Sequence, residues 1–319
     1  MTLTPEHNYR SSLEGVLNIS KPSGISSFAV VSRVRRILGG TKCGHAGTLD
    51  PLAKGVLLVV SGRATRLVPY LPGGLKLYRA EITLGIATTT DDAQGEIVAK
   101  REVPALSVAN IKTVLSTYIG EIAQKPPAFS AVKVSGVRSY KRARAGHLEP
   151  PKARPVYIKN IDLLDYRDNK LIMEVTCGPG TYIRSLARDV GRHLGTCGYL
   201  SDLLRLAEGD YTLEKAISLE DLPNELTRNP IDCPWFTPLD SALPWLAEIV
   251  LDDTQLERLT NGNSVKVERV FKTGQVIRVR DQNGKLYALA NSEAEGELVP
   301  RIVLDKPAKK IKPDENLSP

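Results

Sequence analysis

The feature that most constrains the fold is a pair of long β-type segments with almost nothing between them. Residues 156–167 (VYIKNIDLLDYR) and 170–178 (KLIMEVTCG) are rich in β-branched and aromatic residues, and two residues separate them. This pattern predicts two paired strands. Helices and hairpins alternate irregularly along the chain instead of forming a regular parallel series, so the predicted fold class is α+β. Further strands are predicted at 15–20, 56–61 and 78–84.

Three segments have the apolar spacing of amphipathic helices. The first spans about 27–38, and the second lies in SVANIKTVLSTYIG and stops at Gly120. The third follows a Gly-Pro-Gly turn in GPGTYIRSLARDVGRHLG, where Thr181 can cap it. The apolar face predicted for each helix consists, in turn, of Phe28, Val31, Val34 and Leu38; of Val108, Ile111, Val114 and Leu115; and of Ile183, Leu186, Ala187, Val190 and Leu194.

The sequence changes in character after Leu219. Five prolines between 223 and 244 indicate a tethering segment, and short β-type runs then alternate with turns. Asn283 and Gly284 stand between two such runs and predict a β-hairpin. The predicted organisation is a first domain at 1–245, a small all-β module at 246–305 and a polar, disordered tail at 306–319.

Positive charge is concentrated in one segment. The 319-residue chain has a formal net charge of +7, from 43 Lys and Arg against 36 Asp and Glu. Residues 125–159 contain nine Lys or Arg but a single acid, Glu149, and pairs of prolines stand at 126–127 and 150–151. The prolines indicate an insertion that leaves the core and returns to it. The charge fits either a surface that binds a polyanion or a solvated, mobile loop.

The sequence excludes several kinds of protein. The four cysteines show no Cys-x-x-Cys spacing and the four histidines form no closely spaced pair, so we expect neither a zinc site nor disulfides. The first residues lack the basic-then-apolar pattern of a signal peptide, and no apolar run approaches membrane-spanning length. We therefore expect a soluble cytoplasmic protein with no membrane segment.

The stretch CGHAGTLDPLAKGVLLVV at 43–60 places one carboxylate, Asp50, between a glycine-rich turn and Pro51. Asp50 could cap a helix, the turn could bind phosphate, or the carboxylate could act in covalent catalysis. A phosphate loop is disfavoured because the Gly-x₄-Gly-Lys-Ser/Thr spacing is absent. A catalytic carboxylate must stay ionised, and Arg184, unfavourably placed in the first turn of its helix, is a candidate partner. Tyr78 is either a core aromatic or a stacking platform for a nucleobase.

Six segments in a fixed order resemble the TruB family of tRNA pseudouridine synthases. They are GVLNISKPSGISS, KCGHAGTLDPLAKGVLLV, KLYRAEITLG, KPPAFSAVKVSGVRSYKRARAG, GTYIRSLARDVGRHLG and LSDLLRL. The resemblance spans about 13–210, and the small β module fits the PUA-like C-terminal domain of that family. It implies an α+β catalytic domain with a mixed, largely antiparallel sheet and a basic RNA-binding cleft beside it.

The same resemblance implies an isomerase that converts uridine 55 in the T-loop of tRNA to pseudouridine. The base is flipped out, detached at N1, rotated and rejoined to the ribose through C5. No electron is gained or lost and no group leaves, so no cofactor and no metal are expected. tRNA is the expected partner, with no obligate protein partner and a monomeric state. The alternative is a non-catalytic tRNA-binding chaperone on the same fold.

The resemblance also implies roles for individual residues. Asp50 matches the catalytic aspartate that acts at the ribose, and Arg184 matches the arginine that pairs with it. Tyr78 matches the tyrosine that stacks on the extruded uracil and is also a candidate base. The implied substrate-binding residues are His45 under the flipped T-loop, Tyr182 and Leu203 at the pocket, Lys21 with a mainly structural effect, and Lys133, Arg138, Lys141, Arg142 and Arg144 in an RNA-clasping insertion at about 125–155.

Overall fold

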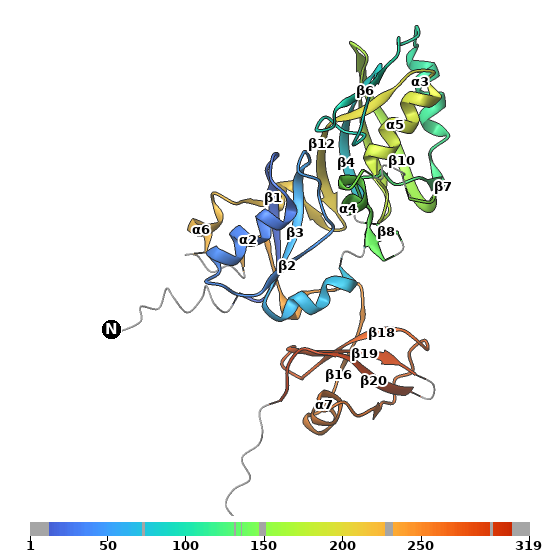
Figure 1. Ribbon diagram of the computed structural model, residues 1–319. Coiled ribbons are helices and arrows are strands. Elements are labelled where there is room, and N and C mark those ends of the chain that lie inside the picture. The colour runs from blue at the N-terminus through green and yellow to red at the C-terminus, as the bar shows by residue number, and fades with distance from the viewer. Residues whose placement is uncertain are drawn as a thin grey trace, which may run out of the picture.

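The computed structural model describes residues 13–71, 74–130, 132–134, 136–146, 151–226, 232–293 and 296–307. These residues form two β-sheet units, the larger one above the smaller C-terminal one in Figure 1. None of the helices in the described part of the chain has the length and apolar character needed to span a membrane.

The larger unit is built on an 11-stranded sheet whose main path runs in the order β14-β1-β3-β12-β4-β11-β10-β7. Two pairings, β1 with β14 and β3 with β12, are parallel. The other pairings in this sheet are antiparallel, so the expected mixed, largely antiparallel sheet is confirmed. Its strands are β1 (Gly15–Lys21), β2 (Cys43–Ala46), β3 (Lys54–Ser61), β4 (Lys76–Leu84), β7 (Gly120–Gln124), β10 (Arg154–Arg167), β11 (Lys170–Cys177), β12 (Gly198–Glu208), β13 (Tyr211–Thr212), β14 (Ile217–Ser218) and β15 (Phe236–Pro238).

The predicted hairpin between β10 and β11 is confirmed. Its antiparallel register pairs Arg167 with Lys170. Asp168 and Asn169 form the two-residue turn, with φ angles of +50° and +58°. Two-residue turns of this kind need positive φ at both positions, and Asp and Asn adopt it more readily than most residues. The local sequence therefore fixes the connection between two central strands.

Helices α3 (Val108–Ser116) and α5 (Ile183–His193) lie together on one face of this sheet, and α2 (Ser27–Ile37) packs against β2 and β3 (Figure 1). The apolar face predicted for α5 is buried throughout. On α2, by contrast, Phe28 is 75% exposed and Val30 is buried instead. Because successive helical residues are about 100° apart, Phe28 lies roughly 200° from Val30, on the other side of the helix.

Two helix starts also differ from the prediction. Val108 is the first residue of α3 and is exposed, while Ile111 and Leu115 carry the packing of that helix. The N-cap of α5 is Tyr182, and Thr181 does not cap it. The Thr181 hydroxyl instead donates a 3.0 Å hydrogen bond to the Gly178 carbonyl, which closes the Gly-Pro-Gly turn.

The smaller unit is a five-stranded sheet with the order β16-β18-β19-β20-β17. Asn283 and Gly284 lie in the turn between β18 and β19, as predicted, and Gly284 has a φ of +82°. This unit also contains a helix, α7 (Asp253–Thr260), that the sequence analysis did not predict, with a capping box formed by Asp252 and Gln255. Its strands are β16 (Ala247–Val250), β17 (Val265–Lys266), β18 (Val276–Arg280), β19 (Leu286–Ser292) and β20 (Glu297–Val303).

The remaining elements are short and lie in the connections. The proline-rich segment predicted as a tether contributes β15, which pairs with β1 in the main sheet. A hairpin of β5 (Ile86–Thr88) and β6 (Ile97–Lys100) carries Asp91 and Asp92 in its turn. The other short elements are β8 (Lys133–Val134), β9 (Val137–Arg138), α4 (Ser139–Arg144), α6 (Leu222–Glu225) and the 3₁₀ helices η1 (Gly62–Tyr70), η2 (Leu213–Lys215) and η4 (Leu239–Ser241).

The two units share an apolar core. Val60 and Leu67 of the larger unit belong to the same buried cluster as Leu289 of the smaller one. Asp305, just after β20, is paired with Arg63 in η1. The smaller unit is therefore packed against the larger through η1. The boundary near residue 245 stays a prediction, and nearly all of the predicted tail lies outside the described residues.

Candidate active site

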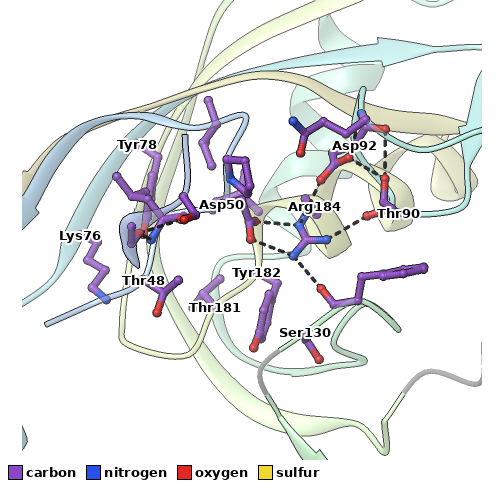
Figure 2. Close-up of a pocket in the computed structure, with 18 of the residues that line it drawn as sticks. Thr48, Asp50, Lys76, Tyr78, Thr90, Asp92, Ser130, Thr181, Tyr182 and Arg184 are labelled. Atoms are coloured by element: carbon purple, nitrogen blue, oxygen red, sulfur yellow. Dashed lines mark hydrogen bonds and ion pairs between the residues drawn. The ribbon is translucent and has the colours of Figure 1, made fainter. Parts of the chain in front are cut away.

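A cavity of about 730 Å³ opens on the larger unit where β4, β12, the start of α5 and the loop after β2 meet. Figure 2 shows Asp50 and Arg184 in direct contact in its lining, with Tyr78 and Lys76 on the opposite side of Asp50 from the guanidinium. Six residues singled out in the sequence line this cavity: His45, Asp50, Tyr78, Tyr182, Arg184 and Leu203.

Asp50 lies in the loop between β2 and β3, residues 47–53, which is called the Asp50 loop below. No helix starts at Pro51, so the helix-cap interpretation is wrong. The Ser27 hydroxyl contacts both the N–H and the carbonyl of Leu49 at 2.9 Å, and the Gly24 N–H donates to the Pro51 carbonyl at 2.8 Å. These bonds fix the loop to the start of α2 and leave the Asp50 side chain 37% exposed at the cavity.

Arg184 holds Asp50 by two contacts. Its Nε lies 2.8 Å from Asp50 Oδ2, and its Nη2 donates to Oδ1 at 3.1 Å. The guanidinium is almost completely buried and also donates to the carbonyls of Thr90 at 3.1 Å and Phe129 at 3.0 Å. This fork geometry suits arginine and fixes the direction of both carboxylate oxygens. The Asp50–Arg184 pair predicted from the sequence is present, and its members lie 134 positions apart in the chain.

A second carboxylate lies behind the guanidinium and was missed in the sequence. Asp92 is buried, and its Oδ2 is 3.6 Å from Arg184 Nε. Its Oδ1 accepts hydrogen bonds from the Thr90 hydroxyl at 2.5 Å and the Gln94 N–H at 3.0 Å. Arg184 is thus held between two acids. Nothing in the string ATTTDDAQG separates Asp92 from an ordinary polar turn residue.

Tyr78 and Leu203 face the cavity from neighbouring antiparallel strands, β4 and β12. Both are largely buried, so they form an apolar slot beside Asp50. Burial raises the pKa of Tyr78 to about 12, against the opposing effect of the nearby Arg205 charge. The phenol is therefore neutral near pH 7. A flat, neutral ring next to a leucine is well suited to hold a planar heterocycle.

Lys21 lies outside the cavity lining. It is buried at the end of β1, and its Nζ donates to the carbonyls of Pro22 at 2.9 Å and Ala53 at 2.6 Å, with Pro51 at 3.3 Å. Burial lowers its pKa to about 8, with the Asp50 charge acting in the opposite direction. Lys21 therefore holds the end of the Asp50 loop, in line with the mainly structural effect that the family resemblance implies.

His45 and Tyr182 also line the cavity. Burial lowers the pKa of His45, and the nearby Arg205 charge adds to the effect, so its imidazole is neutral near pH 7. The backbone of Tyr182 is fixed by Gln124, whose side chain accepts from its N–H at 2.8 Å and donates to its carbonyl at 3.1 Å. The Arg154 guanidinium stands 5.2 Å from the centre of the Tyr182 ring.

Of the five basic residues predicted to clasp RNA, the two whose side chains the structure describes, Lys141 and Arg142, are not among the cavity residues. The five lie on a short hairpin and helix: Lys133 in β8, Arg138 in β9, and Lys141, Arg142 and Arg144 in α4. The side chains of Lys133, Arg138 and Arg144 lie outside the described part, whereas Lys141 is exposed and Arg142 half-buried. The same insertion supplies the Phe129 carbonyl to Arg184, so it reaches the cavity through its backbone.

A buried group of charges beneath the cavity was also missed in the sequence. The Glu208 carboxylate lies 3.2 Å from Arg205 Nη2 and 3.2 Å from Lys76 Nζ. Glu208 and Arg205 are fully buried, and Lys76 lines the cavity wall. In the stretch LSDLLRLAEG, Arg205 and Glu208 have the pattern of solvent-facing residues on an alternating strand.

The cavity thus combines a firmly oriented carboxylate with an apolar surface formed by Tyr78 and Leu203, an arrangement suited to chemistry at a nucleoside. Residues 35–183 match the N-terminal domain of TruB family pseudouridylate synthases, and residues 247–304 match the C-terminal domain of pseudouridine synthase II TruB.

The chain is 44% identical over 252 residues to tRNA pseudouridine synthase B of Roseobacter denitrificans, covering 79% of this chain and 82% of that protein. It is 37% identical over 296 residues to tRNA pseudouridine synthase B of Trichormus variabilis, covering 92% and 99%. The fold matches a chain in the crystal structure of a Cbf5-Nop10-Gar1 complex with a TM-score of 0.71 and 26% identity, over 95% of this chain and 88% of that one. The chain therefore belongs to the TruB family of pseudouridine synthases.

Proposed function

We propose that this chain isomerises uridine 55 in the T-loop of tRNA to pseudouridine. The observation that carries the proposal is the Asp50 carboxylate, held at two points by Arg184 beside the slot between Tyr78 and Leu203. In the reaction the C1′–N1 bond breaks, the uracil rotates and a C1′–C5 bond forms. One proton leaves C5 and one is gained at N1, so substrate and product have the same composition. The protein has to supply orientation, a carboxylate and a path for one proton.

Asp50 acts at the ribose of the target nucleotide. Its side chain is 37% exposed at the cavity, whereas that of Asp92, which also lines the cavity, is only 5% exposed and lies against Arg184. The guanidinium balances its negative charge and directs its oxygens, so the carboxylate is already oriented when the nucleotide arrives. This preorganisation lowers the barrier without any rearrangement of the loop.

Tyr78 and Leu203 hold the uracil while it is detached. A base inside a folded RNA loop cannot reach a slot lined by buried strand residues, so the nucleotide has to be flipped out of its stack. Stacking on an aromatic ring tolerates rotation of the base because it uses only the ring face. A neutral Tyr78 with a pKa of about 12 serves this purpose over the whole physiological range of pH.

We further propose that the chain acts alone and in the cytoplasm. The solved neighbour named above was crystallised as a complex of Cbf5 with Nop10 and Gar1. This chain carries its own basic insertion between 125 and 159, next to the cavity, and clustered cations of this kind bind a phosphate backbone. The insertion supplies the clasp on the T arm of tRNA.

Release of tritium from C5 of uridine-labelled tRNA transcript tests the proposal. Wild-type protein is expected to release tritium, and Asp50→Asn is expected to release none while binding tRNA within a few-fold of wild type. Asp202→Asn is a matched control because Asp202 is also paired with a cation, Lys54 at 2.9 Å, but lies outside the cavity lining.

Two outcomes would contradict the proposal in different ways. If wild-type protein binds tRNA but releases no tritium, the chain is an RNA chaperone or acts on another RNA. If Asp50→Asn loses tRNA affinity as strongly as it loses rate, Asp50 is a binding residue and another group carries the chemistry.

A further inference from the structure

A fully buried acid ends strand β12 directly beneath the Asp50 loop. Glu208 Oε2 lies 3.2 Å from Arg205 Nη2, and Oε1 lies 3.2 Å from Lys76 Nζ. The side chains of Glu208 and Arg205 are not exposed at all, and that of Lys76 is 12% exposed. One carboxylate thus lies between two cations in the interior of the larger unit.

Core packing alone does not explain this arrangement. Transfer of charged groups from water to a protein interior is costly, and apolar residues of similar size often replace a buried ion pair with no loss of stability. The strands around Glu208 already bury many apolar side chains, among them Leu57, Val59 and Leu203. A buried charge network in such a core therefore calls for a different explanation.

Arg205 connects the network to the Asp50 loop. Its Nη2 donates to the Gly47 carbonyl at 2.9 Å, and its Nε donates to the Val56 carbonyl at 2.6 Å. Gly47 is the first residue of the loop, and Val56 lies in β3, the strand that follows the loop. Gly47 has a φ of +72°, and a Cβ placed on it would come within 2.5 Å of Glu208 Oε1. The backbone of the turn therefore rests on the carboxylate itself, and only glycine fits there.

The same network reaches the other side of the cavity. Arg205 lies opposite Tyr78 in the antiparallel pairing of β12 with β4, and its positive charge acts on the phenol. Lys76 precedes Tyr78 by two residues on β4, so both side chains point to the same face of the sheet. Both line the cavity, whereas Glu208 does not. Glu208 can thus influence the cavity through its two cations.

We propose that Glu208 is a positioning residue for the isomerisation. It holds Arg205 and Lys76 in place. Through these two cations it fixes the Gly47 turn, and with it Asp50, relative to Tyr78. This inference rests on the proposed function. Without the negative charge, two buried cations of like sign lie close together with nothing between them to compensate their charge. Repulsion then moves Arg205 away from the Gly47 and Val56 carbonyls, and the loop loses its support.

The test is the single-turnover rate of Glu208→Gln with enzyme in saturating excess over labelled tRNA. Glutamine keeps the shape of the side chain and removes its charge. We expect the rate to fall at least tenfold, while the Kd for tRNA stays within twofold of wild type. The matched control is Glu174→Gln on β11, whose carboxylate pairs with Arg79 at 2.8 Å on the solvent side and whose rate is expected within twofold of wild type.

A purely structural role is separated by two further measurements. Rates are compared at a temperature at which circular dichroism shows each variant fully folded, so a loss of stability alone leaves the rate unchanged. Lys76→Met and the double variant with Glu208→Gln complete a double-mutant cycle. If the two residues act as one network, the double variant loses less rate than the product of the single losses.

Three results would overturn the inference. They are a rate for Glu208→Gln within twofold of wild type, strictly multiplicative losses in the cycle, or a rate loss matched by an equal loss of tRNA affinity. If Glu208→Gln does not fold, Lys76→Met alone decides, because it leaves the Glu208–Arg205 pair in place: less than a twofold loss contradicts the network. A wild-type enzyme that releases no tritium refutes the proposed function instead.

Discussion

Replacing Arg184 by lysine keeps the positive charge and removes the fork. The guanidinium makes five polar contacts, two to Asp50, one each to the carbonyls of Thr90 and Phe129, and a longer one to Asp92 at 3.6 Å. A single ammonium nitrogen cannot reach both carboxylate oxygens along parallel directions, so we expect it to keep one contact to Asp50 at most. The substitution Arg184→Lys therefore separates the effect that orientation of the Asp50 carboxylate has on the rate from the effect of the positive charge beside it.

The expected decrease in the reaction rate follows from the lost contact to Asp50. A hydrogen bond to a charged group contributes about 1.5–3 kcal/mol, and each 1.36 kcal/mol corresponds to about tenfold in rate. Asp50 is 37% exposed, so water replaces part of the loss and the lower half of the range applies. We expect a decrease of roughly 10- to 50-fold in the single-turnover rate of tritium release, with little change in the Kd for tRNA.

Arg188→Lys is the control because Arg188 lies one turn further along the same helix. It contacts Asp91 at 2.9 Å, Asp189 at 2.9 Å and the Lys125 carbonyl at 3.0 Å, but does not line the cavity. The reasoning fails if Arg184→Lys reacts within threefold of wild type. It fails equally if Arg188→Lys slows the reaction as much, since orientation of Asp50 is then not the cause.

Two further predictions concern pH and salt. Lys21 has a pKa of about 8 in the folded chain against an ordinary 10.5. Between these values the unfolded chain binds more protons than the folded chain, so the free energy of unfolding should rise with pH from 8 to 10.5. Urea unfolding at pH 8, 9 and 10 should show this rise for wild type and a smaller one for Lys21→Met, and equal dependence on pH in the two proteins would contradict the prediction. Neutralising Lys141, Arg142 and Arg144 together should weaken tRNA binding. It should also reduce, by about 2, the slope of the logarithm of the tRNA association constant against the logarithm of the salt concentration. An unchanged slope in filter-binding titrations would show that the insertion is not the clasp.

Local sequence patterns predicted several of the larger elements but not always their orientation. The β10–β11 hairpin and the buried face of α5 follow from spacing and turn chemistry alone. Phe28 shows the limit of that reasoning, because one helical turn offers two overlapping apolar stripes and only the sheet beneath α2 decides between them. Thr181 likewise has the chemistry of a cap, but the Gly178 carbonyl is a competing acceptor three residues away.

The site was predictable only where chemistry or the family resemblance pointed to it. Asp50 is conspicuous because a lone acid follows a glycine-rich turn, and Arg184 because a cation is unfavourable at the start of a helix. Asp92 and Glu208 are acids in ordinary surroundings, and their burial depends on pairings between distant strands. Their importance is a property of the tertiary structure, which periodicity within one segment does not contain.

The apolar cluster shared by the two sheet units has a consequence for how this protein can change. Because Leu289 packs into the same cluster as Val60 and Leu67, the C-terminal unit cannot be replaced without changing the packing of the larger unit. Its removal would uncover part of the core that supports β3, the strand following the Asp50 loop. A single cooperative melting transition is the natural behaviour of such a chain, and exchange of the C-terminal unit between relatives should succeed only when η1 is exchanged with it.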